Sequence, residues 1–365
     1  MSQVLLQSLA ERLDGLHQQY NLHFAGQMRA TRDPQMIALL IEAAEAIERE
    51  ARRIQANGDA ALRQEVLDRA AERKTPYDNE AKAIADAVAD MGPEGVEAAI
   101  AGRRANSVFH RYARHFAGKS RSTRDLGLLQ EVIDDLRSIK AHLEALKAQR
   151  QLTQATAGVQ VIEGQLTLFE AELGHIRDAR DAGTLDERAG TLAQIANSQF
   201  ALYDTHFAGQ SRVSRRPELL QRAIAQLEAV LARMEGLQEI GLHDESNRGN
   251  IGVVRGRLAA WQSELAAIRE VRQETSILAM TEALGEAADK ILGAYNEHFA
   301  GQDRASRNIE MLSGLCDQMG EVERQMYAIG GVQRLTVNER NLAMARDLLH
   351  MLEDEWSGIQ EQREP

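Results

Sequence analysis

The stretch "HFAGQMRATR" at residues 23–32 returns three times further along the chain. The later copies read "HFAGKSRSTR" at 115–124, "HFAGQSRVSR" at 206–215 and "HFAGQDRASR" at 298–307. Successive copies begin 92, 91 and 92 residues apart, so almost no insertions separate them. A period this regular predicts tandem copies of one structural module.

A second signature keeps the same register near the end of each period. It consists of an isoleucine that is preceded, seven residues earlier, by a large side chain. The four pairs are Tyr77 with Ile84, Phe169 with Ile176, Trp261 with Ile268, and Leu352 with Ile359. The two signatures together predict four repeats, with bounds at 1–92, 93–184, 185–275 and 276–365.

Each repeat contains three stretches in which apolar residues recur at spacings of three and four, which is typical of helices with one buried face. Leu9, Leu13 and Leu16 lead into the first motif in this way. Aromatic residues make up only 4% of the chain and prolines number 5, while helix formers dominate. The sequence therefore predicts an all-α protein of four tandem three-helix repeats, each an antiparallel, coiled-coil-like bundle. An elongated rod and a folded-back solenoid both fit this pattern.

The joins between repeats differ in composition. The stretches "MGPEG" at 91–95 and "GTLDERAG" at 183–190 contain helix-breaking residues, so we expect a break or kink at each. Residues 250–298 contain no proline and no strong turn cluster, which predicts one helix running from the third repeat into the fourth. Pro76 predicts a kink, or a late start, in the third helix of the first repeat.

Charge and cysteine content exclude several classes of protein. The net charge of −12 disfavours broad affinity for nucleic acid or for anionic membranes. No apolar run approaches the length of a membrane span, and the first residues do not resemble a signal peptide. The single cysteine, Cys316, leaves the fold independent of disulfides and is expected in the core. We therefore expect a cytoplasmic protein.

The motif itself is typical of a connection between two helices. Its glycine suits the left-handed residue that follows a helix, and its histidine falls in the last turn, near the negative end of the helix dipole. Two starts are open for the next helix. The motif's Ser or Thr can cap it (Thr31, Thr123, Ser214, Ser306), or the following pair can begin it ("DP" at 33, "DL" at 125, "RP" at 216, "NI" at 308).

Two arginines per motif, in an acidic chain, indicate fixed partners. They can form ion pairs with carboxylates of their own bundle, dock another protein, or bind a phosphate or carboxylate beside the start of the next helix. The polar residue after each glycine adds a further donor. The candidate binding or structural residues are His23, Gln27, Arg29, Arg32, His115, Lys119, Arg121, Arg124, His206, Gln210, Arg212, Arg215, His298, Gln302, Arg304 and Arg307.

No catalytic signature accompanies the repeats. The sequence has no phosphate-binding glycine loop, no HExxH and no CxxC, and one histidine per repeat is a poor metal site. We therefore expect no cofactor, no metal and no enzymatic activity. The sequence favours a helical-repeat scaffold or assembly protein whose turns make structural or protein–protein contacts, with self-association or a protein partner. The alternative is a receptor for an anionic ligand at the four turns.

Overall fold

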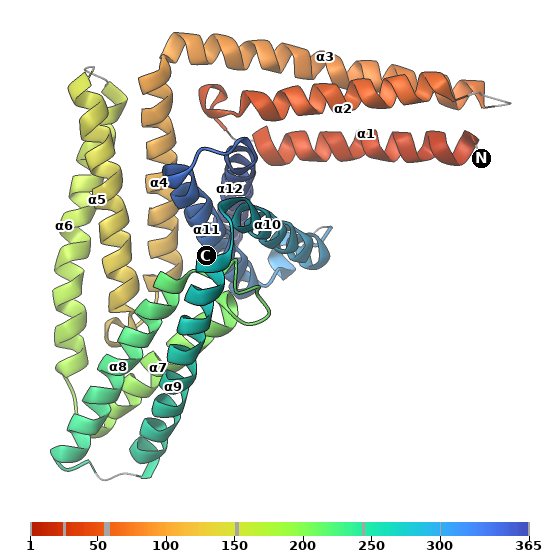
Figure 1. The fold of residues 1–365 in the computed structure, drawn as a ribbon. Coiled ribbons are helices and arrows are strands. Elements are labelled where there is room, and N and C mark those ends of the chain that lie inside the picture. The colour runs from red at the N-terminus through yellow and green to blue at the C-terminus, as the bar shows by residue number, and fades with distance from the viewer. Residues whose placement is uncertain are drawn as a thin grey trace. The chain divides into compact units, whose positions relative to one another are not determined.

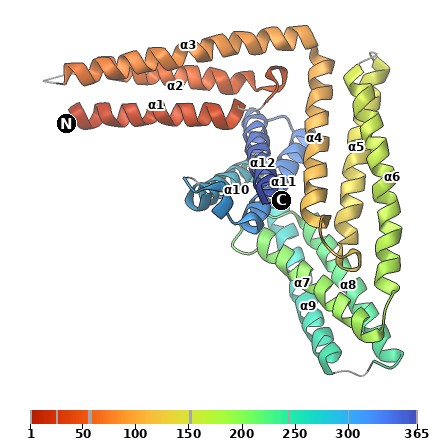
Figure 2. The same ribbon diagram turned by 180° about the vertical axis from the view of Figure 1, so that it is seen from behind.

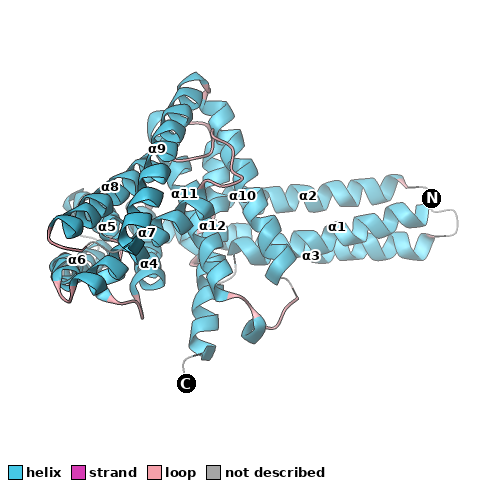
Figure 3. Ribbon diagram, turned by 90° about the horizontal axis from the view of Figure 1, so that it is seen from below, coloured by secondary structure: helices cyan, strands magenta, loops and turns pink. Residues whose placement is uncertain are grey.

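The computed structural model describes residues 2–24, 27–54, 59–149, 153–242, 245–299 and 301–363. These residues form helices joined by turns and contain no strand, as the colouring in Figure 3 shows. The predicted all-α fold class is therefore confirmed. Within the same residues, no helix combines the length and the apolar character needed to cross a membrane.

The helices follow one another along the chain as Figure 1 labels them. They are α1 (Ser2–Phe24), α2 (Pro34–Arg53), α3 (Ala60–Met91), α4 (Pro93–Phe116), α5 (Leu126–Gln149), α6 (Thr153–Asp181), α7 (Leu185–His206), α8 (Pro217–Glu239), α9 (Glu245–Glu274), α10 (Ile277–Phe299), α11 (Ile309–Val332) and α12 (Thr336–Arg363). Short 3-10 turns precede α2, α5 and α11, at Arg29–Thr31, Arg121–Thr123 and Arg304–Ser306.

The chain divides into two compact units. The first unit contains residues 1–100 and 346–351. In it, α1, α2 and α3 pack against one another along their lengths (Figures 1 and 2). Their apolar stripes meet in a core that includes Leu13, Ile37, Leu40 and Tyr77, all at most 2% exposed. The predicted 3–4 spacing of apolar residues thus corresponds to buried faces.

The second unit contains residues 101–345 and 352–365. Here α5 packs on α6, α7 and α9 both pack on α8, and α10 packs on α11. Trp261 of α9 is 2% exposed and lies in the core that α7, α8 and α9 share. Its ring stacks on Tyr203, with centroids 4.9 Å apart. Cys316 is fully buried in α11, as expected for a small core residue.

Two of the three predicted helix joins are confirmed. Gly92 has a φ of 74° between α3 and α4, and a capping box of Thr184 and Glu187 starts α7. The continuous helix expected between the third and fourth repeats is wrong, because α9 ends at Glu274 and α10 begins at Ile277. Ser276 accounts for the break, since its hydroxyl accepts a hydrogen bond from Ala279 N in the manner of an N-cap.

The late start predicted from Pro76 is also wrong. Helix α3 begins at Ala60 and continues through the proline. Val66, Ala70 and Tyr77 on either side of it are at most 2% exposed. Burial of this stripe against α1 and α2 outweighs the roughly 3 kcal/mol cost of proline in a helix interior.

Candidate functional site

Each motif forms a tight turn that closes one helix and leads to the next. The glycines described there have positive φ, at 69° for Gly118, 71° for Gly209 and 76° for Gly301, while Gly26 lies outside the described residues. The phenylalanine before each turn is at most 1% exposed (Phe24, Phe116, Phe207, Phe299). It packs against the tyrosine one helical turn earlier in all four copies. We name residues 27–33, 119–125, 210–216 and 302–308 turns 1 to 4.

The two arginines of every turn contact one glutamate, which lies on a helix about 50 residues further along the chain. In turn 3, Arg212 Nη2 lies 2.8 Å from Glu264 Oε2, and Arg215 Nη1 pairs with Oε1 of the same carboxylate on α9. Turns 1, 2 and 4 repeat the arrangement. The corresponding sets are Arg29, Arg32 and Glu80; Arg121, Arg124 and Glu172; and Arg304, Arg307 and Glu355.

The two arginines differ in burial, and so in what they contribute. The side chain of the first is half exposed, at 50–59% in the four turns, so its ion pair is worth little. The side chain of the second is only 12–16% exposed, and the glutamate 8–14%. The second pair is therefore charge-assisted and largely screened from water.

The second arginine also binds the backbone of its own turn. Arg215 donates from Nη2 to the carbonyl oxygen of Gln210 at 2.7 Å, and Arg32, Arg124 and Arg307 bind the matching carbonyls of Gln27, Lys119 and Gln302. This contact uses the backbone of the residue after the glycine. It explains why lysine replaces glutamine at position 119 without altering the turn.

The motif's Ser or Thr does not cap the following helix, so that alternative is wrong. In each turn its hydroxyl donates to the carbonyl oxygen three residues earlier, as Thr31 does to Met28 at 2.9 Å. The caps come from the following pair, with Asp33, Asp125 and Asn308 accepting bonds from the first amides of α2, α5 and α11. Arg216 takes the cap position of α8 without a side-chain cap bond.

The motif histidines lie in the last turns of their helices but do not share one environment. The side chain of His23 lies outside the described residues, and His298 is exposed. His115 Nε2 lies 3.0 Å from Asp317 Oδ2. Burial lowers the pKa of His206, and Glu321 and Asp317 oppose that shift only in part.

Arginines at the ends of α6 and α9 reach back to the turns. Arg180 donates to the carbonyl oxygens of Ser122 and Arg124, at 3.0 and 2.6 Å. Arg272 donates to those of Val213 and Arg215, at 2.9 and 3.0 Å. The benefit of a cation at a helix end therefore does not fully account for these residues. They also satisfy carbonyls of the turn that the ladder of helix hydrogen bonds leaves open.

Helices of the second unit also contact turns 2 and 3. Gln199 of α7, which is 1% exposed, donates to Asp125 Oδ2 at 2.7 Å. Gln325 of α11 donates to the carbonyl oxygen of Ser214 at 2.9 Å and accepts from Arg272 at 2.8 Å. In both cases a buried helical glutamine satisfies polar groups of a turn.

Ion pairs also connect turn 3, α5 and α11. Arg216 bridges Glu131 and Glu321, at 2.6 and 2.8 Å. Arg324 lies 2.8 Å from Asp135 and 3.2 Å from Glu131. These charges come from segments far apart in the sequence, and each arginine has a carboxylate partner, as buried charges require.

A second cluster of charges centres on Asp317. Arg114, with 2% of its side chain exposed, contacts Asp317 at 3.2 Å and Glu353 at 3.4 Å. Burial alone would raise the pKa of Asp317, but His115 and Arg114 bring it well below the usual range of an aspartate. Asp317 is therefore held as a carboxylate.

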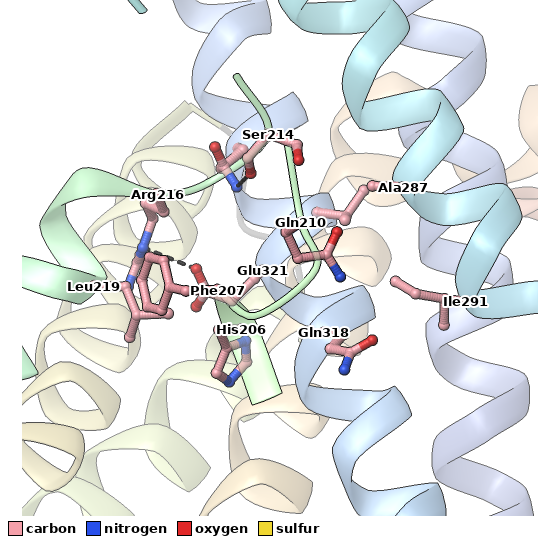
Figure 4. Close-up of a pocket in the computed structure, with 12 residues that line it drawn as sticks. His206, Phe207, Gln210, Ser214, Arg216, Leu219, Ala287, Ile291, Gln318 and Glu321 are labelled. Atoms are coloured by element: carbon pink, nitrogen blue, oxygen red, sulfur yellow. Dashed lines mark hydrogen bonds and ion pairs between the residues drawn. The ribbon is translucent and has the colours of Figure 1, made fainter. Parts of the chain in front are cut away.

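Figure 4 shows a small cavity where turn 3 faces α10 and α11. Its lining includes His206, Gln210, Ser214, Gln318 and Glu321. A volume of about 30 Å³ admits a molecule the size of water and excludes an organic ligand. Within the described residues there is also no group of three metal-ligating side chains.

Sequence reasoning missed the glutamates that the arginines hold. The four glutamates share one position, four residues before the signature isoleucine and three residues after the large side chain: Glu80, Glu172, Glu264 and Glu355. A search for any acidic residue in the second signature would have found them. The ion pairs predicted from the arginines named no carboxylate, because the glutamate lies about 50 residues from its arginines.

Comparison with models of protein families, with curated proteins and with solved structures gives no match. We therefore infer the function from the residues of this chain.

Proposed function

We propose that this chain is a non-enzymatic scaffold of four tandem three-helix repeats, with bounds at 1–92, 93–184, 185–275 and 276–365. In this proposal the motif turns have two structural tasks. Each clamps the first and third helices of its own repeat, and some also seat a helix from elsewhere. The observation that carries the proposal is the fourfold recurrence of two arginines on one glutamate.

The clamp explains why each turn needs two arginines. A turn connects the first helix to the second, and it is not adjacent in sequence to the third. The glutamate extends from the third helix, and the two guanidinium groups bind it from the turn. The second arginine also holds the turn's carbonyl, so one side chain fixes both the shape of the turn and the position of the helix.

The same contacts weigh against the anion receptor that the sequence left open. The second arginine of turn 3 uses Nε, Nη1 and Nη2 within its own repeat. An anion would have to compete with a fixed carboxylate for the remaining donors, most of them on the half-exposed first arginine. Such a competition disfavours binding, because like charges would share one site.

The contacts of turns 2 and 3 support a role in assembly. Gln199 and Gln325 belong to repeats that follow the turns they contact. Such a turn holds its own repeat together and also binds a helix of the next repeat. Side-chain contacts would then determine how successive repeats pack in the scaffold. We also propose a cytoplasmic location, a proposal that the buried, unpaired Cys316 supports.

The proposal is tested by replacing Glu172 with Gln in the full chain and measuring thermal unfolding with and without inorganic phosphate. The clamp predicts a lower melting temperature for Glu172→Gln and equal effects of phosphate and of chloride at matched ionic strength. The control is Glu170→Gln, on the same helix as Glu172. It removes an exposed ion pair with Arg137 of α5 and should change the melting temperature little.

An anion receptor predicts a different result. Glu172→Gln would then leave the fold stable and would lower the Kd for phosphate, because the competing carboxylate is gone. Phosphate would therefore stabilise the variant more than the wild type, since stabilisation by a ligand rises with the ratio of its concentration to Kd. That outcome would replace the scaffold proposal with its alternative.

A further inference from the structure

Turn 4 differs from the other three turns in exposure. Its Ser306 and Asn308 are exposed, whereas the matching residues of turns 1, 2 and 3 are buried or half-buried. The matching pairs are Thr31 and Asp33, Thr123 and Asp125, and Ser214 and Arg216. The hydrogen bonds of Ser306 and Asn308 stay inside the turn and the first residues of α11.

The other turns show what covers this surface. Turn 2 holds Gln199 of α7, and turn 3 holds Gln325 of α11. Within the first unit, Gln27 of turn 1 donates to Asp347 of α12. Each of these turns therefore contacts a helix that is not part of its own clamp, through a hydrogen bond that involves a glutamine.

The helices on turns 2 and 3 share a short pattern. In each, the glutamine follows a buried apolar residue by three positions, as Gln325 follows Val322 and Gln199 follows Ala196. The two side chains lie on one helix face at this spacing. The apolar residue supplies contact area, and the amide pairs with the polar turn.

One exposed helix face of this chain has the same pattern. Val4 of α1 is 68% exposed, and Gln7, three residues later, is also exposed. Leu5, at 48% exposed, extends the apolar surface. Among the large apolar residues that the structure describes as exposed, Val4 alone has a glutamine at this spacing.

We propose that turn 4 of one molecule binds the Val4–Gln7 face of α1 of a second copy of this chain. The inference rests on the proposed scaffold function and applies the same kind of turn-to-helix contact between two molecules. Turn 2 seats α7, turn 3 seats α11, and turn 4 seats α1 of the next copy, with Gln7 donating to Asn308 or to the backbone of the turn. Because the two surfaces differ, the contact is head-to-tail and repeats until a ring closes or a filament grows.

Sedimentation velocity over a concentration series tests this inference on the full chain. The wild type should show a sedimentation coefficient that rises with concentration. Val4→Glu replaces the exposed apolar contact with a charge and should weaken association about tenfold or more. Gln18→Glu, at an exposed position of the same helix, is the control and should leave association unchanged.

A pair of substitutions tests the contact itself. Asn308→Asp keeps the helix cap, since Asp33 and Asp125 cap in the same way. It should strengthen association about threefold or more, because Asp125 accepts the amide of Gln199 in turn 2. Combined with Gln7→Glu it should weaken association beyond the product of the single effects, because two carboxylates then meet.

The outcomes separate this inference from the proposal on which it rests. A protein that stays monomeric up to several hundred micromolar, or one whose association ignores both Val4→Glu and Asn308→Asp, overturns the docking of α1. The clamp is judged from unfolding of Glu172→Gln, a measurement that does not depend on association. A stable monomer would therefore end this inference and leave the scaffold proposal intact.

Discussion

Substituting Glu264 with Gln is the sharpest test of the clamp, because it removes one charge and almost no volume. The carboxylate has 14% of its side chain exposed and receives Arg212 and Arg215. The amide of glutamine retains one acceptor oxygen and adds an NH₂ group that faces the guanidinium groups. The substitution therefore leaves the buried Arg215 short of one charged partner.

The magnitude follows from the burial of each pair. The hydrogen bond from Arg215, which is 13% exposed, contributes about 1.5–3 kcal/mol as a bond to a charged group. The pair with Arg212, which is 50% exposed, contributes little to stability. Glutamine can still accept a hydrogen bond from Arg215, but it leaves this buried guanidinium group without its charged partner. We therefore expect Glu264→Gln to lower the free energy of unfolding by about 2–3 kcal/mol.

Amide hydrogen exchange in α9 measures this loss where it occurs. A loss of about 2–3 kcal/mol corresponds to exchange roughly 30- to 150-fold faster in the buried part of the helix. Glu270→Gln makes the same chemical change at an exposed position of α9 and should have little effect. This control removes contributions from net charge and from the helix dipole.

The loss of stability caused by Glu264→Gln should also depend on pH. Hydrogen bonding by Arg212, and then the charge of Arg215, hold the pKa of Glu264 below its usual value, despite burial. A depressed pKa contributes stability above the unfolded-state pKa of about 4.3, and that contribution is lost as the pH falls through the folded-state pKa. The difference between wild type and Glu264→Gln should thus be constant near neutral pH and shrink below about pH 4. Equal exchange in Glu264→Gln and Glu270→Gln at pH 7 would refute the clamp.

Four further substitutions probe other parts of the fold, each measured by urea unfolding. Gly209→Ala should cost about 1–2 kcal/mol because φ is 71°, whereas Gly236→Ala, in α8 with open space around its Cβ position, should stabilise by about 0.5–1 kcal/mol. Thr184→Ala removes the capping box of α7 and should cost about 1 kcal/mol. Asp317→Asn leaves the buried Arg114 with Glu353 as its remaining carboxylate and should cost about 1.5–3 kcal/mol; a loss below about 1 kcal/mol would show that Asp317 contributes little.

The sequence was sufficient to predict the helical class and the buried faces. Leu9 and Leu13 of α1 and Trp261 of α9 were predicted from apolar spacing alone, and all are at most 2% exposed. The positive φ of Gly209 and Gly301 followed from the need to leave a helix abruptly. Such features depend on residues within a few positions of one another, and periodicity reports them directly.

Other features depended on which of two local bonds prevails. Ser276 can remain in a helix or cap the next one, and the sequence near it contains no proline to decide the outcome. Thr31 can cap α2 or bond back to Met28, and Asp33 two residues later is the better cap. The continuous helix predicted across Ser276 was wrong because the cap at this serine was overlooked, whereas for Thr31 the sequence had left both helix starts open.

The arginines and the histidines of the motif differ in how far along the chain their partners lie. Each clamp glutamate lies about 50 residues after its arginines, which is less than the period of 91 or 92 residues in the sequence, and the same contacts recur in all four clamps. His115 instead pairs with Asp317, about 200 residues further along the chain, whereas His298 is exposed. A repeated residue therefore keeps a repeated role only where its partner lies inside the copied unit. In the proposed scaffold the motif arginines are structural in every copy, and we expect contacts with other molecules at positions whose surroundings differ between copies, such as Ser306 and Asn308.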